Sequence, residues 1–229
     1  LHAVAMAEHA LGLMLAFARK LHLARDLQQA RRWGQVELWT QPPAFGQLAD
    51  GTLGLVGLGT VGSALAGRAA ALGMRVIAVR AHPRPDPAPA HEQWGPERLG
   101  EMLALADWVV LAAPHTAATR GMIGAAELAR MKRGAVLVNL GRGALVDEPA
   151  LVEALREGRI AGAALDVVRG EPLEAGSPLW GLPNVLLTPH VAGLGPGHWE
   201  GAVEQFAENL RRYLAGEPLR NVVDKVTGY

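Results

Sequence analysis

Cysteine is absent from this chain of 229 residues, and no long run of apolar residues or of like charges occurs. Without cysteine there is no disulfide, no thiolate metal site and no cysteine nucleophile, and a reducing cytoplasm is allowed. The most apolar N-terminal segment, residues 10–18, is too short to cross a bilayer and lacks a basic leader. Because 22 basic residues balance 22 acidic ones, neither nucleic acid nor an anionic membrane is expected as the main partner. We expect a soluble cytoplasmic protein without a metal site.

Glycine, by contrast, is plentiful, and three glycines mark the most informative stretch of the chain. Residues 52–56 form a short apolar run typical of a buried strand, and a Gly-x-Gly-x-x-Gly pattern follows directly at residues 57–62. Residues 63–72 are rich in alanine and leucine, which predicts a helix that ends at Gly73. A second apolar run at residues 75–79 completes a strand, turn, helix and strand.

Each glycine of this turn has a mechanical interpretation. Gly57 allows the tight turn, Gly59 lets a pyrophosphate approach the backbone, and Gly62 lets the helix pack closely on the strand. The phosphates then lie at the helix N-terminus, where free N–H groups and the helix dipole favour an anion. The pattern alone is weak in a glycine-rich chain, but its place between strand and helix predicts a dinucleotide site. Its expected contacts also include Thr60 and Val61; a glycine-rich turn without a ligand is the alternative.

The rest of the chain alternates between expected helices and strands. Residues 3–33 are helical in character, with apolar positions on one face at Val4, Leu11, Leu15 and Ala18. Residues 33–51 are interpreted as an irregular arm whose Trp33 and Trp39 would be covered by a dimer partner or by a local hydrophobic cluster. Further helices are expected at residues 96–105, 125–131, 149–157 and 198–214, and further strands at residues 108–111, 135–139, 160–165 and 185–187.

This alternation predicts an α/β fold, a Rossmann-type parallel sheet with helices on both faces. The ligand of such a sheet lies along the carboxyl ends of the strands. Residues at or after these ends are therefore candidates for the site, although they are far apart in sequence. The expected cofactor contacts outside the glycine turn are Arg80, Pro114, Thr119, Asn139, Asp166 and His190.

Charge suggests a role for several of these residues in hydride transfer to a carbonyl group. Arg142 could hold the carboxylate of a 2-oxo acid and polarise its carbonyl. His190 could donate the proton in reduction and accept it in oxidation, and Glu171 could favour the charged imidazole and orient it. Asp166 could hold the nicotinamide carboxamide. Each has a simpler interpretation: a solvated loop arginine, a satisfied loop histidine, an ordinary turn glutamate and a strand-end cap.

Four blocks of sequence carry a more specific signal: residues 57–62, 131–143, 164–172 and 183–190. In their order and spacing the chain resembles the D-2-hydroxyacid dehydrogenases, nicotinamide-dependent enzymes that include glyoxylate and hydroxypyruvate reductases. The likeness begins at residues 7–10 and covers nearly the whole chain. It implies an NAD(P)-dependent oxidoreductase that interconverts small 2-hydroxy and 2-oxo acids. It also implies a catalytic set of Arg142, Glu171 and His190. The alternative function is a dinucleotide-sensing or assembly module of the same fold without turnover.

The chain departs from the family's pattern at two places. Members that prefer NAD have an acidic residue at the end of the second strand, whereas this chain has Arg80, followed by His82 and Arg84. Since an arginine accommodates a 2′-phosphate, we predict that NADP is preferred, with NAD as the alternative.

Members also begin with a segment as long as a domain, which forms most of a separate substrate domain. This sequence does not show that segment. We expect residues 1–193 to form the dinucleotide-binding domain of a homodimer, with residues 1–50 as a helix and arm that contact the partner. Residues 194–229 would form a C-terminal helix and tail that return to the substrate domain.

Overall fold

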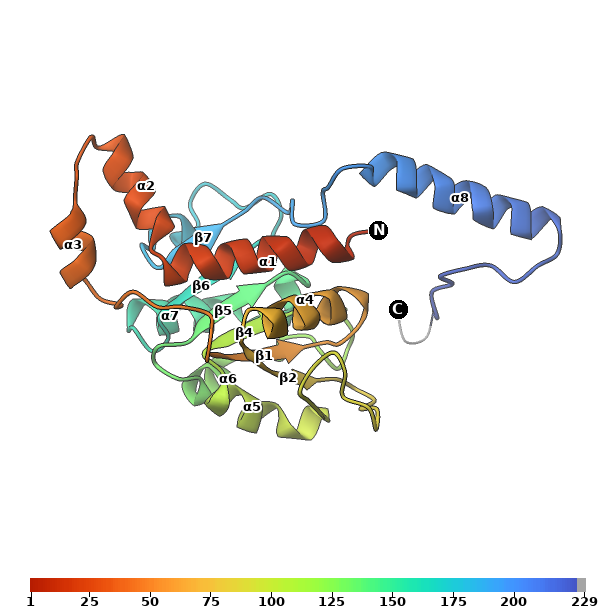
Figure 1. The fold of residues 1–229 in the computed structure, drawn as a ribbon, viewed down its shortest axis with the longest axis horizontal. Coiled ribbons are helices and arrows are strands. Elements are labelled where there is room, and N and C mark those ends of the chain that lie inside the picture. The colour runs from red at the N-terminus through yellow and green to blue at the C-terminus, as the bar shows by residue number, and fades with distance from the viewer. Residues whose placement is uncertain (226–229) are drawn as a thin grey trace.

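A computed structural model describes residues 1–225, and the last four residues of the predicted tail lie outside it. Its centre is a seven-stranded sheet in the order β3-β2-β1-β4-β5-β6-β7, in which every neighbouring pair is parallel (Figure 1). The order reverses between β1 and β4, which opens a crevice at the carboxyl ends of these strands. The strands are β1 (Thr52–Val56), β2 (Arg75–Val79), β3 (Glu92–Trp94), β4 (Trp108–Leu111), β5 (Val136–Asn139), β6 (Gly162–Leu165) and β7 (Val185–Leu187).

Helices cover both faces of the sheet, as the sequence predicts. One face packs against α1 and α4 through a core that includes Met14 and Leu65, and the other against α5, α6 and α7 through Met102, Leu128 and Leu151. The helices are α1 (Ala3–Ala18), α2 (Leu21–Gln29), α3 (Gln35–Thr40), α4 (Thr60–Ala71), α5 (Leu99–Leu105), α6 (Ala125–Arg130), α7 (Glu148–Arg156) and α8 (His198–Leu214), with 3₁₀ turns at Pro96–Arg98, Gly143–Leu145 and Pro178–Gly181.

Residues 3–33, expected to be helical in character, form the two helices α1 and α2, which are separated by a turn at Lys20. This residue has a left-handed backbone (φ 51°) and a side chain only 1% exposed. Its Nζ donates hydrogen bonds to the carbonyl oxygens of Leu38 (2.6 Å) and Gln41 (2.5 Å), and it lies 4.9 Å from the centre of the Phe45 ring. Lys20 therefore ties the arm to the end of α1, a tertiary contact without a sequence signal.

The buried face of α1 differs in part from the prediction, although Ala18 is buried and Leu11 half-buried as expected. Val4 and Leu15 are exposed, while Ala7, Ala10 and Met14 are fully buried. The small side chains at positions 7 and 10 let α1 lie close to α4. The face of α1 that is buried is therefore one with fewer large residues.

Other departures are local. The polar edge strand β3 was not predicted, α3 lies inside the arm expected to be irregular, and α4 begins at Thr60, three residues early. Trp33 and Trp39 are 93% and 73% exposed, so no local hydrophobic cluster within the described residues covers them. No helix within residues 1–225 is long and apolar enough to span a membrane.

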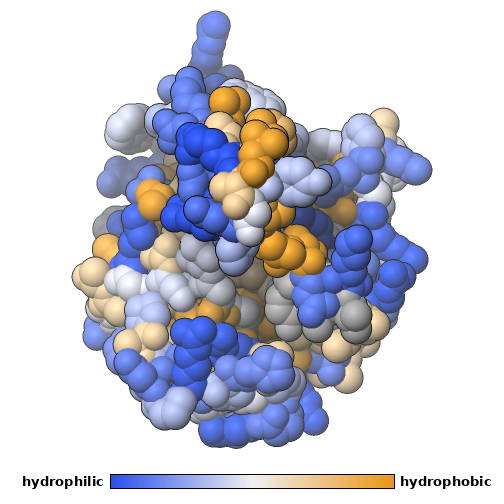
Figure 2. Space-filling model, turned by 90° about the vertical axis from the view of Figure 1, so that its right-hand side faces the viewer, coloured by the Kyte–Doolittle hydropathy of each residue, from blue (hydrophilic) through white to orange (hydrophobic). Residues whose placement is uncertain are grey.

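Helix α8 matches its predicted range and extends away from the sheet (Figure 1). None of its residues is buried, and the helix has an exposed apolar stripe. The molecule viewed from that end shows hydrophobic surface in its upper half (Figure 2). The stripe includes Trp199, Val203, Phe206 and Leu210.

Candidate active site

The glycine turn joins β1 to α4 at the crevice, and its geometry suits the role expected of each glycine. Gly57 has φ +97°, and a Cβ there would lie 2.8 Å from the backbone nitrogen of Ala113. A Cβ at Gly62 would lie 2.1 Å from the carbonyl oxygen of Gly57, so this position is closed by helix–turn packing. At Gly59 no atom lies within 4 Å of the Cβ position, which leaves room above the backbone for a ligand.

The turn also supplies donors for an anion. Gly59 is the N-cap of the 12-residue helix α4, and the first helical hydrogen bond runs from the N–H of Ser63 to its carbonyl oxygen (2.8 Å). The N–H groups of Thr60 and Val61 therefore have no partner within the helix. Together with the positive end of the helix dipole, they fit the pyrophosphate of a dinucleotide.

Arg80 lies directly after β2, at the edge of the same crevice. Its backbone N–H donates to the carbonyl oxygen of Trp94 (3.0 Å), and its side chain is partly exposed. None of the ion pairs between described residues involves its guanidinium. The following loop, with His82 and Arg84, is held by Gln93, which accepts from the N–H of Arg84 (3.1 Å). This edge therefore presents a positive group that has no ion-pair partner among residues 1–225.

Glu171 and His190 form a hydrogen-bonded pair, although 19 residues separate them. The distance from His190 Nδ1 to Glu171 Oε2 is 2.6 Å, and Glu171 Oε1 accepts from the N–H of Val168 (3.2 Å). With its Nδ1 proton directed to the carboxylate, the imidazole has Nε2 free to exchange a proton with a substrate. The histidine side chain is half exposed, so a ligand can reach it.

Arg142 projects from a loop shaped by the buried Asn139. The amide of Asn139 donates to the carbonyl oxygen of Arg142 (3.0 Å) and accepts from the N–H of Gly141 (3.1 Å). One guanidinium nitrogen of Arg142 donates to the carbonyl oxygen of Gly141 (2.7 Å). Since Asn139 uses both ends of its amide in the loop, the structure gives it a shaping role, and its cofactor contact stays a prediction.

Asp166 follows β6, and its side chain is 2% exposed. The carboxylate accepts from the hydroxyl of Thr188 (2.6 Å) and from the N–H groups of Val191 and Ala192 (3.0 Å each). These contacts fit the strand-end cap, the simpler of its two interpretations; the contact with the carboxamide stays a prediction.

Thr119 likewise uses its hydroxyl within the protein, where it donates to the carbonyl oxygen of Pro114 (2.7 Å) and accepts from the N–H of Thr116 (2.8 Å). It stabilises the loop after β4, while Pro114 faces the crevice.

The predicted catalytic residues do converge. Arg142, Glu171 and His190 line one cleft of about 840 Å³. Val61 of the glycine turn and Pro114 line it too, so the three predicted catalytic residues lie beside the expected dinucleotide site. Among residues 1–225, no group of three or more His, Asp or Glu side chains is arranged to hold a metal ion.

The cleft also contains residues that the sequence did not single out as site residues. Met6 reaches it from α1, and Arg169 lines it from the loop before Glu171. Met6 could not be predicted, because the rule about strand ends excludes a residue on a helix before the first strand. Arg169 lies two residues before Glu171, but nothing distinguishes it in sequence from a solvated arginine.

Comparisons with known proteins identify the family of this chain. Residues 11–192 match the family described as D-isomer specific 2-hydroxyacid dehydrogenase, NAD binding domain. The chain is 38% identical to a glycerate dehydrogenase of Methylorubrum extorquens, over 95% of this chain and 67% of that protein. It is 40% identical to a glyoxylate reductase of Thermococcus gammatolerans, over 96% of this chain and 66% of that protein. The chain thus spans about two thirds of the length of these curated relatives.

Solved structures show the same relationship. A D-isomer specific 2-hydroxyacid dehydrogenase from Xanthobacter autotrophicus, in complex with NADPH and MES, has a TM-score of 0.85 and 37% identity, covering all of this chain and 90% of that one. An NADPH-dependent glyoxylate/hydroxypyruvate reductase from Sinorhizobium meliloti, in complex with NADP and sulfate, has a TM-score of 0.86 and 31% identity, covering all of this chain and 70% of that one. This chain belongs to the D-isomer specific 2-hydroxyacid dehydrogenase family of NAD(P)-dependent oxidoreductases and contains its NAD-binding domain.

Proposed function

We propose that this protein reduces small 2-oxo acids such as glyoxylate or hydroxypyruvate to 2-hydroxy acids, and catalyses the reverse oxidation. The observation that carries the proposal is the convergence of Arg142, Glu171 and His190 in one cleft beside the glycine turn. The known activities of the relatives named above support it.

A bound nicotinamide cofactor supplies the hydride in reduction and takes it in oxidation. The guanidinium of Arg142 holds the substrate carboxylate and polarises the neighbouring carbonyl. His190 donates a proton from Nε2 to the carbonyl oxygen as negative charge develops there. Glu171, 2.6 Å from Nδ1, keeps the ring in the orientation and tautomer that this step requires, and it stabilises the charged imidazole.

The test is the oxidation of NADPH, followed by absorbance, with a panel of 2-oxo acids. We expect turnover with at least one small member of the panel and none without a 2-oxo acid. Tight cofactor binding without turnover across the panel would favour the sensing or assembly module instead.

We further propose that NADP is the preferred cofactor. The support is the uncompensated charge of Arg80 at the end of β2, together with the NADPH and NADP found in two related structures. Arg80→Asp should shift the ratio of kcat/KM values toward NADH, whereas Arg25→Asp, on the exposed surface of α2, should leave the ratio unchanged. Equal efficiency of the wild type with both cofactors, or a preference for NADH, would contradict the proposal.

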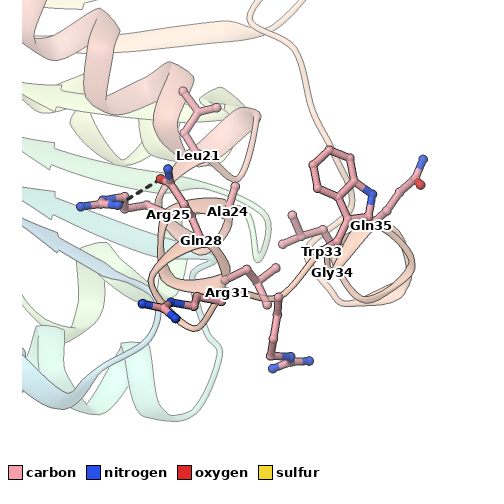
Figure 3. A pocket seen from close by; sticks show the side chains of 11 residues that line it. Leu21, Ala24, Arg25, Gln28, Arg31, Trp33, Gly34 and Gln35 are labelled. Atoms are coloured by element: carbon pink, nitrogen blue, oxygen red, sulfur yellow. Dashed lines mark hydrogen bonds between the residues drawn. The ribbon is translucent and has the colours of Figure 1, made fainter.

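A homodimer held through the arm is also proposed. Between α2 and α3 is a hollow of about 790 Å³, and its rim includes the nearly fully exposed Trp33 (Figure 3). Val36 and Trp39 extend this apolar surface. A second copy is one means of covering it, because exposed apolar patches of this kind mark interaction sites. Sedimentation should give a dimer for the wild type and for Trp180→Ala, and a monomer for the double variant Trp33→Ala/Trp39→Ala; a monomeric wild type contradicts the proposal.

Residues 194–229 are proposed to leave the dinucleotide-binding domain of residues 1–193 and to pack on a substrate domain. The support is the exposed apolar stripe of α8. The cytoplasmic location stays a prediction.

A further inference from the structure

A partly buried series of hydrogen bonds lies behind the loop that carries His190. It begins at His9 on α1, whose Nε2 lies 3.0 Å from the hydroxyl oxygen of Thr188. That hydroxyl lies 2.6 Å from Asp166 Oδ1, and His9 Nε2 lies 3.7 Å from the same oxygen. Three residues that are up to 179 positions apart thus meet in one contact. None of them lines the cleft that contains the catalytic residues.

The chemistry of the three groups fixes the direction of each hydrogen bond. An ionised carboxylate only accepts, so the hydroxyl of Thr188 gives its one hydrogen to Asp166. The hydroxyl oxygen must then accept from His9, which places a hydrogen on His9 Nε2. A side chain that cannot donate at position 9 would leave this lone pair without its protein partner. The His9 side chain is 22% exposed, at a hollow between α1 and the loop after His190.

The series of hydrogen bonds from His9 through Thr188 to Asp166 ends at the backbone around His190. His190 has φ 54°, a left-handed conformation that is unfavourable for a non-glycine residue and needs support from its surroundings. Its N–H donates to the carbonyl oxygen of Asp166 (2.9 Å), and the next two N–H groups, of Val191 and Ala192, donate to the Asp166 carboxylate. Asp166 therefore supports the unusual backbone from both sides, and Thr188 is held at the start of the same loop.

We propose that His9 is a positioning residue for His190. The hydrogen bond from His9 fixes the orientation of the Thr188 hydroxyl, which in turn donates to Asp166. Thr188 and Asp166 then keep loop 188–192 in the conformation that directs the His190 imidazole to Glu171 and the cleft. The inference rests on the proposed function, because it assigns a role in the same reaction. It extends the site to α1, which already contributes Met6 to the cleft one turn before His9.

The test compares His9→Leu, which removes the donor, with His9→Gln, whose side-chain amide can still donate. We expect His9→Leu to lower kcat about 10-fold, the lower end of the range for loss of an outer hydrogen-bond partner at metal sites. Cofactor affinity should change less than about 2-fold, because the glycine turn is untouched. His9→Gln should recover most of kcat. His22→Leu, which alters a part-buried histidine on α2, is the matched control and should keep wild-type kcat.

A double variant tests whether the contact with Thr188 carries the effect. The loss in His9→Leu/Thr188→Val should equal that in Thr188→Val, because the two residues act through one hydrogen bond. Multiplying losses, or an equal loss in His9→Gln and His9→Leu, would overturn the proposal.

A measurement independent of turnover separates this inference from the proposed function. The NMR signals of the His190 ring, assigned by comparison with His190→Ala, should shift in His9→Leu, return in His9→Gln and stay unchanged in His22→Leu. Unchanged His190 signals in His9→Leu would overturn the inference even for an active enzyme. If the wild type turns over no 2-oxo acid, the proposed function fails, and the shift alone still shows that His9 positions His190.

Discussion

Two glycines of the turn separate the folding role of this motif from its binding role. In Gly62→Ala the new Cβ would lie 2.1 Å from the carbonyl oxygen and 3.1 Å from the carbonyl carbon of Gly57. Both atoms are backbone, so the first turn of α4 must move away from β1. Forced overpacking of this kind costs about 1–3 kcal/mol. For a chain of this size, a loss of about 2 kcal/mol lowers Tm by roughly 4–8 °C.

Gly59→Ala is the matched variant, because its Cβ meets no atom within 4 Å and its φ of −88° suits alanine. Alanine is a poorer N-cap than glycine by about 0.5 kcal/mol, so Tm should fall by only about 1–2 °C. The methyl group, however, occupies the space left open for the pyrophosphate. We expect the Kd for NADPH to rise at least about 10-fold, which corresponds to about 1.4 kcal/mol.

Differential scanning calorimetry of the two apoproteins gives the first quantity, and titration of NADPH fluorescence gives the second. A wild-type Tm for Gly62→Ala would show that helix and turn are not in contact as described. Wild-type NADPH affinity for Gly59→Ala would refute the assignment of the open space to the cofactor.

Three further substitutions test other parts of the account. Glu171→Gln keeps the shape of the side chain but removes its charge, so kcat for reduction should fall about 10²-fold while the Kd of the cofactor changes little. Stopped-flow kinetics measures both quantities, and an unchanged kcat would contradict the role of the Glu171–His190 pair. Arg142→Lys replaces the planar guanidinium, which can bind a carboxylate through two nitrogens, so kcat/KM for the 2-oxo acid should fall about 10- to 100-fold in steady-state assays. An unchanged kcat/KM would show that the substrate carboxylate binds elsewhere. Lys20→Met removes two hydrogen bonds to the arm and should lower the free energy of unfolding by about 1–3 kcal/mol in urea titration; equal stability would mean that the arm is held by other contacts.

The sheet could be predicted wherever its strands are fully buried. Parallel central strands such as β1, β4 and β5 are short apolar runs, and glycines mark where the neighbouring segments turn. Strand β3 has no such signal, since Glu92 and Gln93 are polar and partly exposed at the sheet edge. It forms because β2 offers a free edge for pairing, which a local pattern does not contain.

The site residues that follow strand ends could be predicted from the topology of the sheet. Arg142, Glu171 and His190 follow strand ends, so the rule for parallel sheets brings them together. Met6 and His9 lie on a helix ahead of the first strand. Met6 reaches the cleft, and His9 reaches Thr188 behind it, only through the packing of α1 on the sheet. The break at Lys20 is of the same kind, because contacts with the distant arm determine it.

Transfer of deuterium tests the central claim most directly. Under single-turnover conditions, the protein is mixed with glyoxylate and NADPH carrying deuterium on both positions of C4 of the nicotinamide. We expect glycolate with deuterium on C2, detected by mass spectrometry, and at least about 10²-fold slower formation by His190→Ala, as expected for loss of a proton donor. Bound cofactor that transfers no deuterium to glyoxylate or hydroxypyruvate, or equal rates for the two proteins, would contradict the proposed chemistry of this cleft.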